Sequence, residues 1–285
     1  FEGPEGFIKL PGKNGPLNQE IENYLVKQNK IGLFYPGIVK RIKNRTLRII
    51  AKEIGEINIR INDEVRAYMN RTLSSSEKTK LKVGSIVWVT KRTDGKNKYK
   101  LTNKPKVEGS IVAIQTNNGA IKALVGGYDF YSNKYNRAIQ AYRQPGSAIK
   151  PFIFGAALEK GISTSTIVND LPVNFDAEST GGVLWEPSNF NDVYLGPISI
   201  KEALTKSQNM VSIRLIKRIN PSFAQSYIRR FGFESSRNPP YFTLALGAGA
   251  VTPLQLAVGY SIIANGGFYV KPYFIDRIVD SEGRL

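Results

Sequence analysis

A serine and a lysine three residues apart are the side chains in this sequence best suited to covalent chemistry. Ser147 and Lys150 lie in the stretch Arg-Gln-Pro-Gly-Ser-Ala-Ile-Lys-Pro. On a helix this spacing places both side chains on one face. A serine hydroxyl needs a neighbouring base, and a lysine is that base at neutral pH only if burial or another cation destabilises its ammonium form. Free N–H groups at a helix start could also hold an oxyanion.

Histidine and cysteine are both absent from the sequence. Their absence excludes Ser-His-Asp, Cys-His and His-metal mechanisms, disulfides and thiolate zinc sites. The structural alternative for Ser147 is a helix-capping serine beside a solvated lysine. A second Ser-x-x-Lys spacing, Ser75 to Lys78, lies in a polar stretch where nothing would bury the lysine. Lys150, in contrast, precedes the apolar run PFIFGAAL.

Two further stretches could complete a site. Ser207-Gln208-Asn209 separates two helical patterns: its serine could relay a proton to a leaving amine, and its asparagine could bind a substrate carbonyl and hold the lysine. Capping of the following helix is the alternative. In the stretch WEPSN we predict that Trp185 and Asn189 bind substrate, with a lid packed on the domain as the alternative for Trp185.

Helices and strands must position these residues. The charge composition of residues 1–107 differs from that of residues 108–285. Lysine and arginine outnumber acidic residues by 23 to 10 in residues 1–107 and by 17 to 13 in residues 108–285. Residues 38–107 contain about five short alternating runs separated by turn signals such as Asp94-Gly95, which predicts a small basic barrel of the oligonucleotide- or oligosaccharide-binding kind. We expect a loop at 71–82. Residues 1–37 are rich in glycine and proline around one helical pattern at 17–30, and we interpret them as a linker.

Residues 108–285 predict an α+β domain. Asn117-Asn118-Gly119 between two apolar runs is a hairpin signal. Helical patterns follow at 151–160, 199–206, 208–219, 222–231 and 253–264. Strands followed by helices are typical of helices packed on an antiparallel sheet. The apolar tract 244–264 contains Thr252 and Pro253 in N-cap and first-turn positions, which favours a buried helix over a membrane span.

Short motifs in a fixed order carry a family resemblance. They are GGYDF, YNRAIQA, RQPGS, AIKPF, ALEKG, WEPSN, IKEALTKSQN, RRFGF and LALGAG followed by VTPLQLAVGYSIIANGG. From about residue 109 onward the chain resembles the transpeptidase domain of class A penicillin-binding proteins. Residues 38–107 are similar to the OB-like insert of the Gram-negative subgroup, and the opening residues resemble the linker after its glycosyltransferase domain. The resemblance implies a penicillin-binding/serine β-lactamase-like α+β domain, truncated before its last strands, beside a small OB-like β domain.

The resemblance also implies roles for four residues. Ser147 would attack the D-Ala-D-Ala carbonyl of a peptidoglycan stem peptide, D-alanine would leave, and an amine of a neighbouring stem peptide would accept the acyl group. Lys150 would be the base for Ser147, Ser207 the proton relay and Asn209 the orienter of substrate and lysine. β-Lactams would acylate Ser147. No cofactor or metal is implied.

One expected motif is absent from the sequence. Neither Lys-Thr-Gly nor Lys-Ser-Gly occurs, although the family uses such a motif to bind the substrate carboxylate and complete the oxyanion hole. We therefore interpret the chain as a piece of a longer protein and expect the motif beyond Leu285. Loss of one oxyanion donor costs about 10²–10³ in rate, so the piece alone would be impaired.

Several partners and alternatives follow. The resemblance implies binding of stem peptides, glycan strands and β-lactams, periplasmic protein activators bound through the OB-like domain, and a membrane anchor in the full-length protein at the periplasmic face of the inner membrane. The alternatives are a DD-carboxypeptidase or β-lactamase on the same scaffold, which pass the acyl group to water. A basic OB-like binding module is the alternative from another class; nucleic acid is the less favoured ligand.

Overall fold

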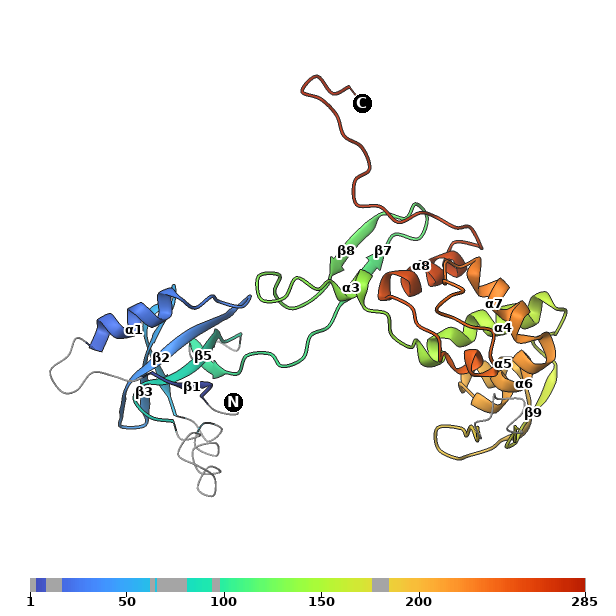
Figure 1. Cartoon of the computed structure of the whole chain (residues 1–285), viewed down its shortest axis with the longest axis horizontal. Coiled ribbons are helices and arrows are strands. Elements are labelled where there is room, and N and C mark those ends of the chain that lie inside the picture. The colour runs from blue at the N-terminus through green and yellow to red at the C-terminus, as the bar shows by residue number, and fades with distance from the viewer. Residues whose placement is uncertain are drawn as a thin grey trace. The chain divides into compact units, whose positions relative to one another are not determined.

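The chain forms two structural units (Figure 1). The computed structural model describes residues 4–8, 17–61, 65, 81–93, 98–175 and 185–284. The first unit comprises Phe1–Glu108 and Tyr128–Lys134, and the second comprises Gly109–Gly127 and Tyr135–Leu285. The spacing Ser75 to Lys78, the Asp94-Gly95 turn and the predicted loop up to residue 80 lie outside the described residues.

The first unit is built on an antiparallel sheet. Its elements are β1 (Gly6–Phe7), α1 (Leu17–Val26), β2 (Phe34–Lys43), β3 (Thr46–Ala51), β4 (Gly55–Arg60), β5 (Ser85–Lys91) and β6 (Tyr99–Thr102). The sheet order is β1-β5-β2-β3-β4, with β6 paired to β5. All five predicted strands are present, because alternating apolar residues bury one face of each strand around a core that includes Leu47, Ile49 and Val89.

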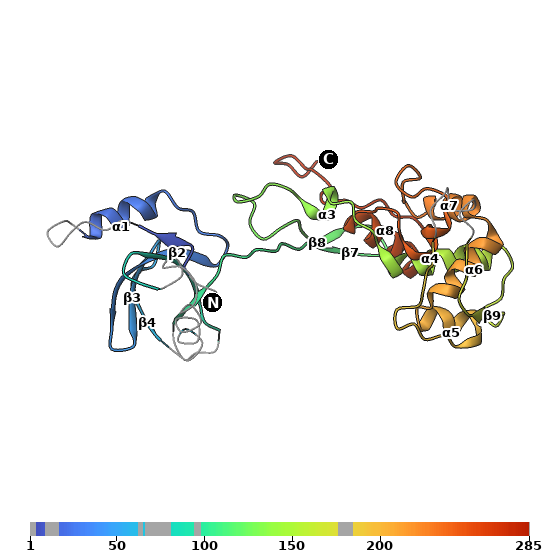
Figure 2. The same cartoon turned by 60° about the horizontal axis from the view of Figure 1, so that its bottom comes forward.

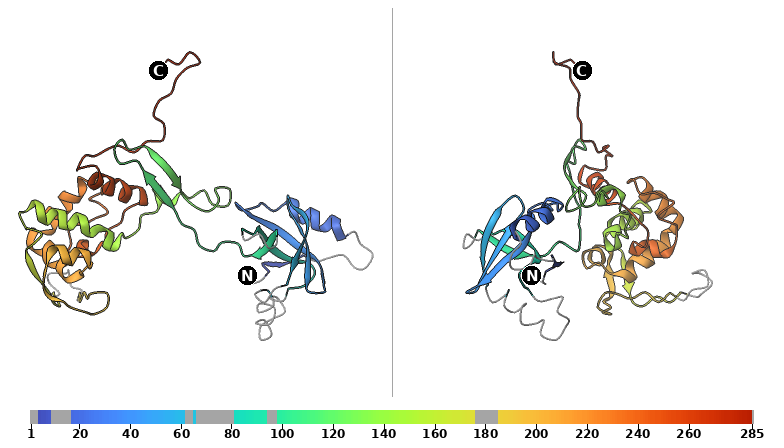
Figure 3. Two further views of the ribbon diagram at one scale, coloured as in Figure 1. Left: turned by 180° about the vertical axis from the view of Figure 1, so that it is seen from behind. Right: turned by 60° about the vertical axis from the view of Figure 1, so that its left-hand side comes forward.

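Residues 1–37 differ from the linker that we expected. Strand β1 pairs with β5. Helix α1 buries Ile21 and Leu25 against Ile38 of β2, and Figure 3 shows it lying along the sheet. A two-residue strand is too short to show an alternating apolar pattern, so the sequence did not predict it. The segment Tyr128–Lys134 also joins this unit, where the rings of Tyr128 and Phe34 lie 5.3 Å apart.

The second unit begins with the predicted hairpin and continues as a helical cluster. Its elements are β7 (Ile111–Ile114), β8 (Ile121–Val125), α3 (Arg137–Gln140), η3 (Gly146–Ile149), α4 (Lys150–Glu159), β9 (Ile167–Asp170), β10 (Gly196–Ser199), α5 (Ile200–Thr205), α6 (Asn209–Ile219), α7 (Pro221–Arg229), η5 (Phe242–Leu246) and α8 (Pro253–Ala264). The hairpin β7–β8 packs against α8, and α4 packs against α6 and α7 (Figure 2).

Helices α4 and α8 organise the core of this unit. Phe152 of α4 contacts the rings of Phe231, Phe233 and Tyr260 edge to face, at centroid distances of 4.9–5.2 Å. Helix α8 starts as predicted: Thr252 caps the helix by accepting from the N–H of Gln255, whose side chain in turn binds the Thr252 N–H. Within the described part of the chain, no helix is both long and apolar enough to cross a membrane.

Candidate active site

Ser147 lies in a short 3₁₀ turn, η3, that runs directly into α4. The Lys150 N–H donates to the Ser147 carbonyl, so both residues belong to the same turn. Pro151 occupies the first turn of α4, where its missing N–H costs nothing. Ser147 is exposed whereas Lys150 is buried. The Pro-Gly-Ser start of the helix therefore exposes the Ser147 hydroxyl to solvent and places Lys150 in the protein interior one turn later.

The segment that follows η5 packs against the η3 turn that carries Ser147. Gly247 has φ 72°, and a Cβ atom there would lie 2.3 Å from the Gly146 carbonyl oxygen, so only glycine allows the approach. Arg143 and Val251 exchange two backbone hydrogen bonds of 3.0 Å. The Tyr260 hydroxyl donates to the Ala148 carbonyl at 2.9 Å. Gly247, Val251 and Tyr260 together thus hold the Ser147 turn in place.

Lys150 is 1% exposed and binds residues from another part of the chain. Its ammonium donates to the Ser207 carbonyl at 2.6 Å, to the Ser207 hydroxyl at 3.1 Å and to Asn209 Oδ1 at 2.6 Å. Three acceptors match the three hydrogens of an ammonium group. This geometry excludes the solvated lysine of the structural alternative.

Burial lowers the pKa of Lys150 to about 8, while the negative charge of Asp170 opposes the shift. A desolvated ammonium loses its proton more readily because the low-dielectric surroundings disfavour the charged form. A useful fraction of Lys150 is therefore the neutral amine near neutral pH. That satisfies the electrostatic condition for a lysine base.

The stretch Ser207-Gln208-Asn209 directs its side chains at Lys150 rather than at its own helix. Ser207 has a left-handed backbone, φ 55°, which ends α5 and presents both its carbonyl and hydroxyl to the ammonium. Such a conformation costs a non-glycine residue about 1–2 kcal/mol. The N-cap residue of α6, Gln208, makes no side-chain capping bond. Capping by this stretch, the alternative considered from the sequence, is not observed.

Asn189 supplies the missing cap. It is 3% exposed, and its Oδ1 accepts from the N–H groups of Asn209 and Met210 at 2.9 and 3.3 Å. Its amide nitrogen donates to Asp170, at 2.9 and 3.1 Å to the two carboxylate oxygens, and to the Val193 carbonyl. Both polar atoms of Asn189 thus have protein partners, which indicates a positioning role. Its predicted substrate contact stays a prediction.

Asp170 was not predicted as a site residue, because a single carboxylate at the end of a short apolar run does not indicate a function. It is fully buried, and it also accepts from the Leu195 N–H at 3.0 Å. Together with Asn189 it fixes the start of α6, which carries Asn209. The Asn209 amide nitrogen donates to the Ser188 carbonyl at 2.8 Å, leaving its oxygen turned to Lys150.

A pocket of about 410 Å³ opens onto these groups. Ser147, Ser207 and Asn209 line it together with Asn189, Phe190, Asn191, Val193, Lys206 and Gln208. This volume is typical of a small-ligand site. Phe190 is 98% exposed at the rim, a feature that the sequence did not reveal. The tertiary structure thus brings Ser147 and the Ser-x-Asn stretch to one cavity, although 60 positions separate Ser147 from Ser207.

Trp185 is not among the residues that line this pocket. Its ring packs on Phe175 at a centroid distance of 4.9 Å, and Phe175 packs in turn on Phe242. This arrangement matches the alternative of a lid packed on the domain, and substrate binding by Trp185 stays a prediction.

Comparisons with known proteins agree with this geometry. The profile of the penicillin binding protein transpeptidase domain matches residues 109–284, and that of the penicillin-binding protein OB-like domain matches residues 1–107. Penicillin-binding protein 1A of Neisseria lactamica is 37% identical over the whole chain. The chain spans about a third of that relative, 35% of its length.

Solved structures agree as well. Penicillin-binding protein 1A from Haemophilus influenzae matches 99% of this chain with a TM-score of 0.84 and 33% identity, over 41% of its own length. The protein PonA1 from Mycobacterium tuberculosis, solved in complex with penicillin V, matches 61% of this chain with a TM-score of 0.54 and 28% identity, over 48% of its own length. On this evidence, the chain belongs to the penicillin-binding protein transpeptidase family and carries the OB-like domain of penicillin-binding proteins.

Proposed function

We propose that this chain provides the DD-transpeptidase site of a peptidoglycan synthase, with Ser147 as nucleophile. The observation that carries the proposal is the buried Lys150 ammonium, bound by Ser207 and Asn209, one turn from an exposed serine in the same pocket. The substrate class comes from the family resemblance, which links this arrangement to D-Ala-D-Ala peptides.

The first step is acylation of Ser147. Lys150 loses a proton to become a neutral amine, and the amine takes the Ser147 proton as the hydroxyl oxygen attacks the carbonyl of the penultimate D-alanine. The Ser147 N–H is the proposed first donor to the oxyanion that develops on the substrate carbonyl.

The second step is departure of the terminal D-alanine. Its amine must gain a proton, and the Ser207 hydroxyl, 3.1 Å from the Lys150 nitrogen, can pass one on because a hydroxyl both donates and accepts. The carbonyl and amide oxygens that also bind Lys150 can only accept. An amine from a neighbouring stem peptide then attacks the acyl-enzyme with the proton transfers reversed, which forms the cross-link and frees Ser147.

Labelling with a fluorescent penicillin tests the proposal in the full-length protein. The expected result is one covalent adduct on Ser147 that is absent from the Ser147→Ala variant. An adduct that persists for many minutes would argue against a β-lactamase, and release of D-alanine without cross-linked product would indicate a carboxypeptidase. No adduct on Ser147 would refute the proposal.

We also propose that the full-length protein acts at the periplasmic face of the inner membrane, that it carries a membrane anchor and a glycosyltransferase domain, and that protein activators bind the OB-like domain. The support is its similarity to penicillin-binding protein 1A of other bacteria, of which this chain matches 35%. Cell fractionation of the full-length protein tests the location: recovery in the cytosol would contradict it.

A further inference from the structure

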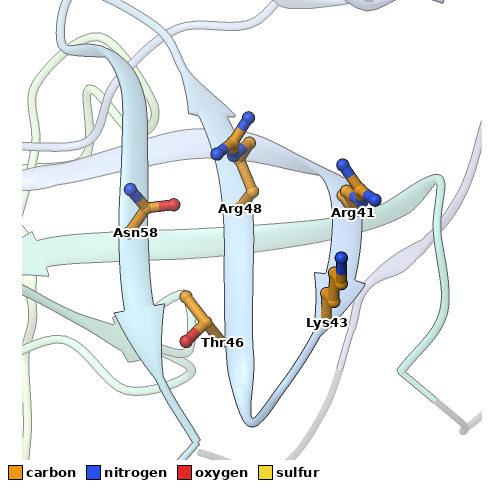
Figure 4. Close-up of a pocket in the computed structure, with 5 residues that line it drawn as sticks. All are labelled: Arg41, Lys43, Thr46, Arg48 and Asn58. Carbon is orange, nitrogen blue, oxygen red and sulfur yellow. The ribbon is translucent and has the colours of Figure 1, made fainter.

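The outer face of strands β2, β3 and β4 carries a cluster of cations. In the sheet register, Arg41 lies opposite Arg48, and Arg48 lies opposite Asn58. Two residues further along β2, Lys43 lies opposite Thr46, and Thr46 lies opposite Arg60. Figure 4 shows five of these side chains on three adjacent strands: Arg41, Lys43, Thr46, Arg48 and Asn58. The alternation of the strands therefore gathers the basic residues on one surface.

These five side chains line a small hollow of about 100 Å³. Helix α1 covers the other end of the same face, where Ile50 packs against the cluster formed by Ile21, Leu25 and Ile38. The cations thus lie beyond the helix, in solvent. The hollow has room for a single small group such as a carboxylate or a phosphate, rather than for a whole base or ring.

The charges on this face are not balanced. Like charges directly opposite on adjacent strands destabilise a sheet, and Arg41 and Arg48 are such a pair. Of the acidic side chains among the described residues, Glu56 approaches the cluster; it binds Lys40 at 2.9 Å and Arg48 at 3.1 Å. In the same described residues, neither Arg41 nor Lys43 forms an ion pair. Unpaired cations on this face destabilise the sheet unless an anion neutralises them. We therefore expect an anion to bind here.

The aromatic and apolar residues near the hollow indicate which class of anionic ligand it can bind. Single-stranded nucleic acids need aromatic rings on which bases stack. The aromatic residues of these strands, Phe34 and Tyr35, pack instead on Tyr128 and on the core. A membrane surface favours exposed apolar side chains that insert between lipids. None of the large exposed apolar residues of the described chain lies in β2, β3 or β4.

We infer that this hollow binds carboxylate groups of a peptide-bearing glycan polymer. The inference rests on the proposed function, because each stem peptide that ends in D-alanine presents a terminal carboxylate on a repeating strand. Planar guanidinium groups from Arg41 and Arg48 suit a planar carboxylate, and the Asn58 amide and Thr46 hydroxyl add hydrogen-bond donors. The site holds the polymer by charge, and its residues are different from those proposed to carry out the chemistry.

Binding of soluble glycan–peptide fragments to the 285-residue chain tests the inference. The fragments are released from peptidoglycan by a muramidase, labelled on the sugar and titrated at about 50 mM salt. The variant Arg41→Gln/Lys43→Gln is compared with Lys27→Gln/Lys91→Gln, which removes the same charge from exposed lysines of the same unit that do not line the hollow.

We expect the Arg41/Lys43 variant to bind at least about tenfold more weakly, and the Lys27/Lys91 control to change by less than about twofold, because each charge-assisted hydrogen bond contributes more than a screened surface charge. Fragments whose carboxylates are converted to neutral amides should bind wild type no better than they bind the variant. Thermal unfolding should show the Arg41/Lys43 variant to be at least as stable as wild type, since the variant relieves repulsion.

Equal losses in the two double variants, or unchanged affinity for the amidated fragments, would overturn the inference. So would a dependence on Arg41 and Lys43 that appears only with phosphatidylglycerol vesicles or single-stranded DNA. Penicillin labelling of Ser147 in the full-length protein separates this result from the proposed function. Labelling without fragment binding refutes the carboxylate site alone, and binding without labelling refutes the transpeptidase assignment alone.

Discussion

Lys150 is the single residue on which the proposed chemistry depends most. The PFIFGAAL run and the contacts from Ser207 and Asn209 remove it from water, and this burial lowers its pKa to about 8. A lysine in water, with a pKa near 10.4, would be protonated almost completely at neutral pH. Burial therefore makes the neutral amine accessible, even though the three hydrogen-bond acceptors favour the ammonium form.

The pH dependence of acylation follows from this shift. Because the base is the deprotonated amine, the rate of penicillin acylation should rise about tenfold per pH unit below pH 8 and level off above it. Stopped-flow labelling of the full-length protein from pH 6 to pH 9 measures this profile. The variant Lys150→Gln should be about 10²–10⁴ times slower and lack the rise. A flat wild-type profile would contradict the role of Lys150 as base.

Asn189 links the site to the stability of the fold. The change Asn189→Ala leaves two N–H groups of α6 and the buried Asp170 carboxylate short of partners, so we expect a loss of about 3 kcal/mol in the free energy of unfolding. Denaturant unfolding measures the loss. Asn191→Ala is the matched control, since Asn191 is exposed on the same pocket rim and should change stability by less than about 0.5 kcal/mol. Equal effects of the two changes would contradict the positioning role.

At the scale of elements, the position of Ser147 depends on the packing of η3 against the end of η5. The close approach between Gly247 and Gly146 joins two segments 101 positions apart and fixes the turn that presents the hydroxyl. Misplacement of a nucleophile by about 1 Å can cost on the order of 10² in rate.

Replacing Gly247 by alanine tests this packing. A Cβ atom there would meet the Gly146 carbonyl oxygen at 2.3 Å, so η3 must shift, and we expect penicillin acylation to slow by at least about tenfold. Gly161→Ala is the control. Gly161 has a similar backbone, φ 82°, but no atom within 4 Å of the added methyl group. Gly161→Ala should cost about 1–2 kcal/mol in stability because of its backbone conformation alone. Gly247→Ala should cost more because of the added clash, and only Gly247→Ala should slow labelling. Equal labelling rates in the two variants would refute the role of Gly247 in holding the Ser147 turn in place.

At the scale of the whole molecule, the two units have separate cores. Leu47 is fully buried in the first unit, and Leu215, at 1% exposed, lies in the core of the second. The two tryptophans of the sequence fall one in each unit, Trp88 in β5 and Trp185 in the second. Fluorescence can therefore follow each unit when the other tryptophan is replaced by phenylalanine.

A core truncation in one unit should leave the other unaffected. Leu47→Ala should reduce the stability of the first unit by about 2–5 kcal/mol and leave the Trp185 transition unchanged, whereas Leu215→Ala should do the reverse. Denaturant titrations of the 285-residue chain, read by each tryptophan separately, measure both. If either change shifts both transitions equally, the units unfold as one and the division is wrong.

The sequence alone determined the parts of this protein that depend on neighbours in the chain. The strands at 46–51 and 85–91 follow from alternating apolar residues, and helix α8 follows from its Thr252 cap and Pro253. The Ser-x-x-Lys spacing predicted a nucleophile and a base, and the order of the motifs indicated the family. Apart from the order of the motifs, each of these signals acts over a few residues, so local periodicity and capping are enough to predict it.

Only the tertiary structure decided which of these residues meet. Lys150 is buried by Ser207 and Asn209, 57 and 59 positions away, and no local pattern predicts desolvation by distant partners. The same reason explains why Asp170 was missed, why Asn189 holds the start of α6, and why β1 joins the first sheet. The opposition of Arg41 to Arg48 likewise depends on strand register. Burial and charge balance are properties of packing, and packing brings together residues that are distant in the sequence.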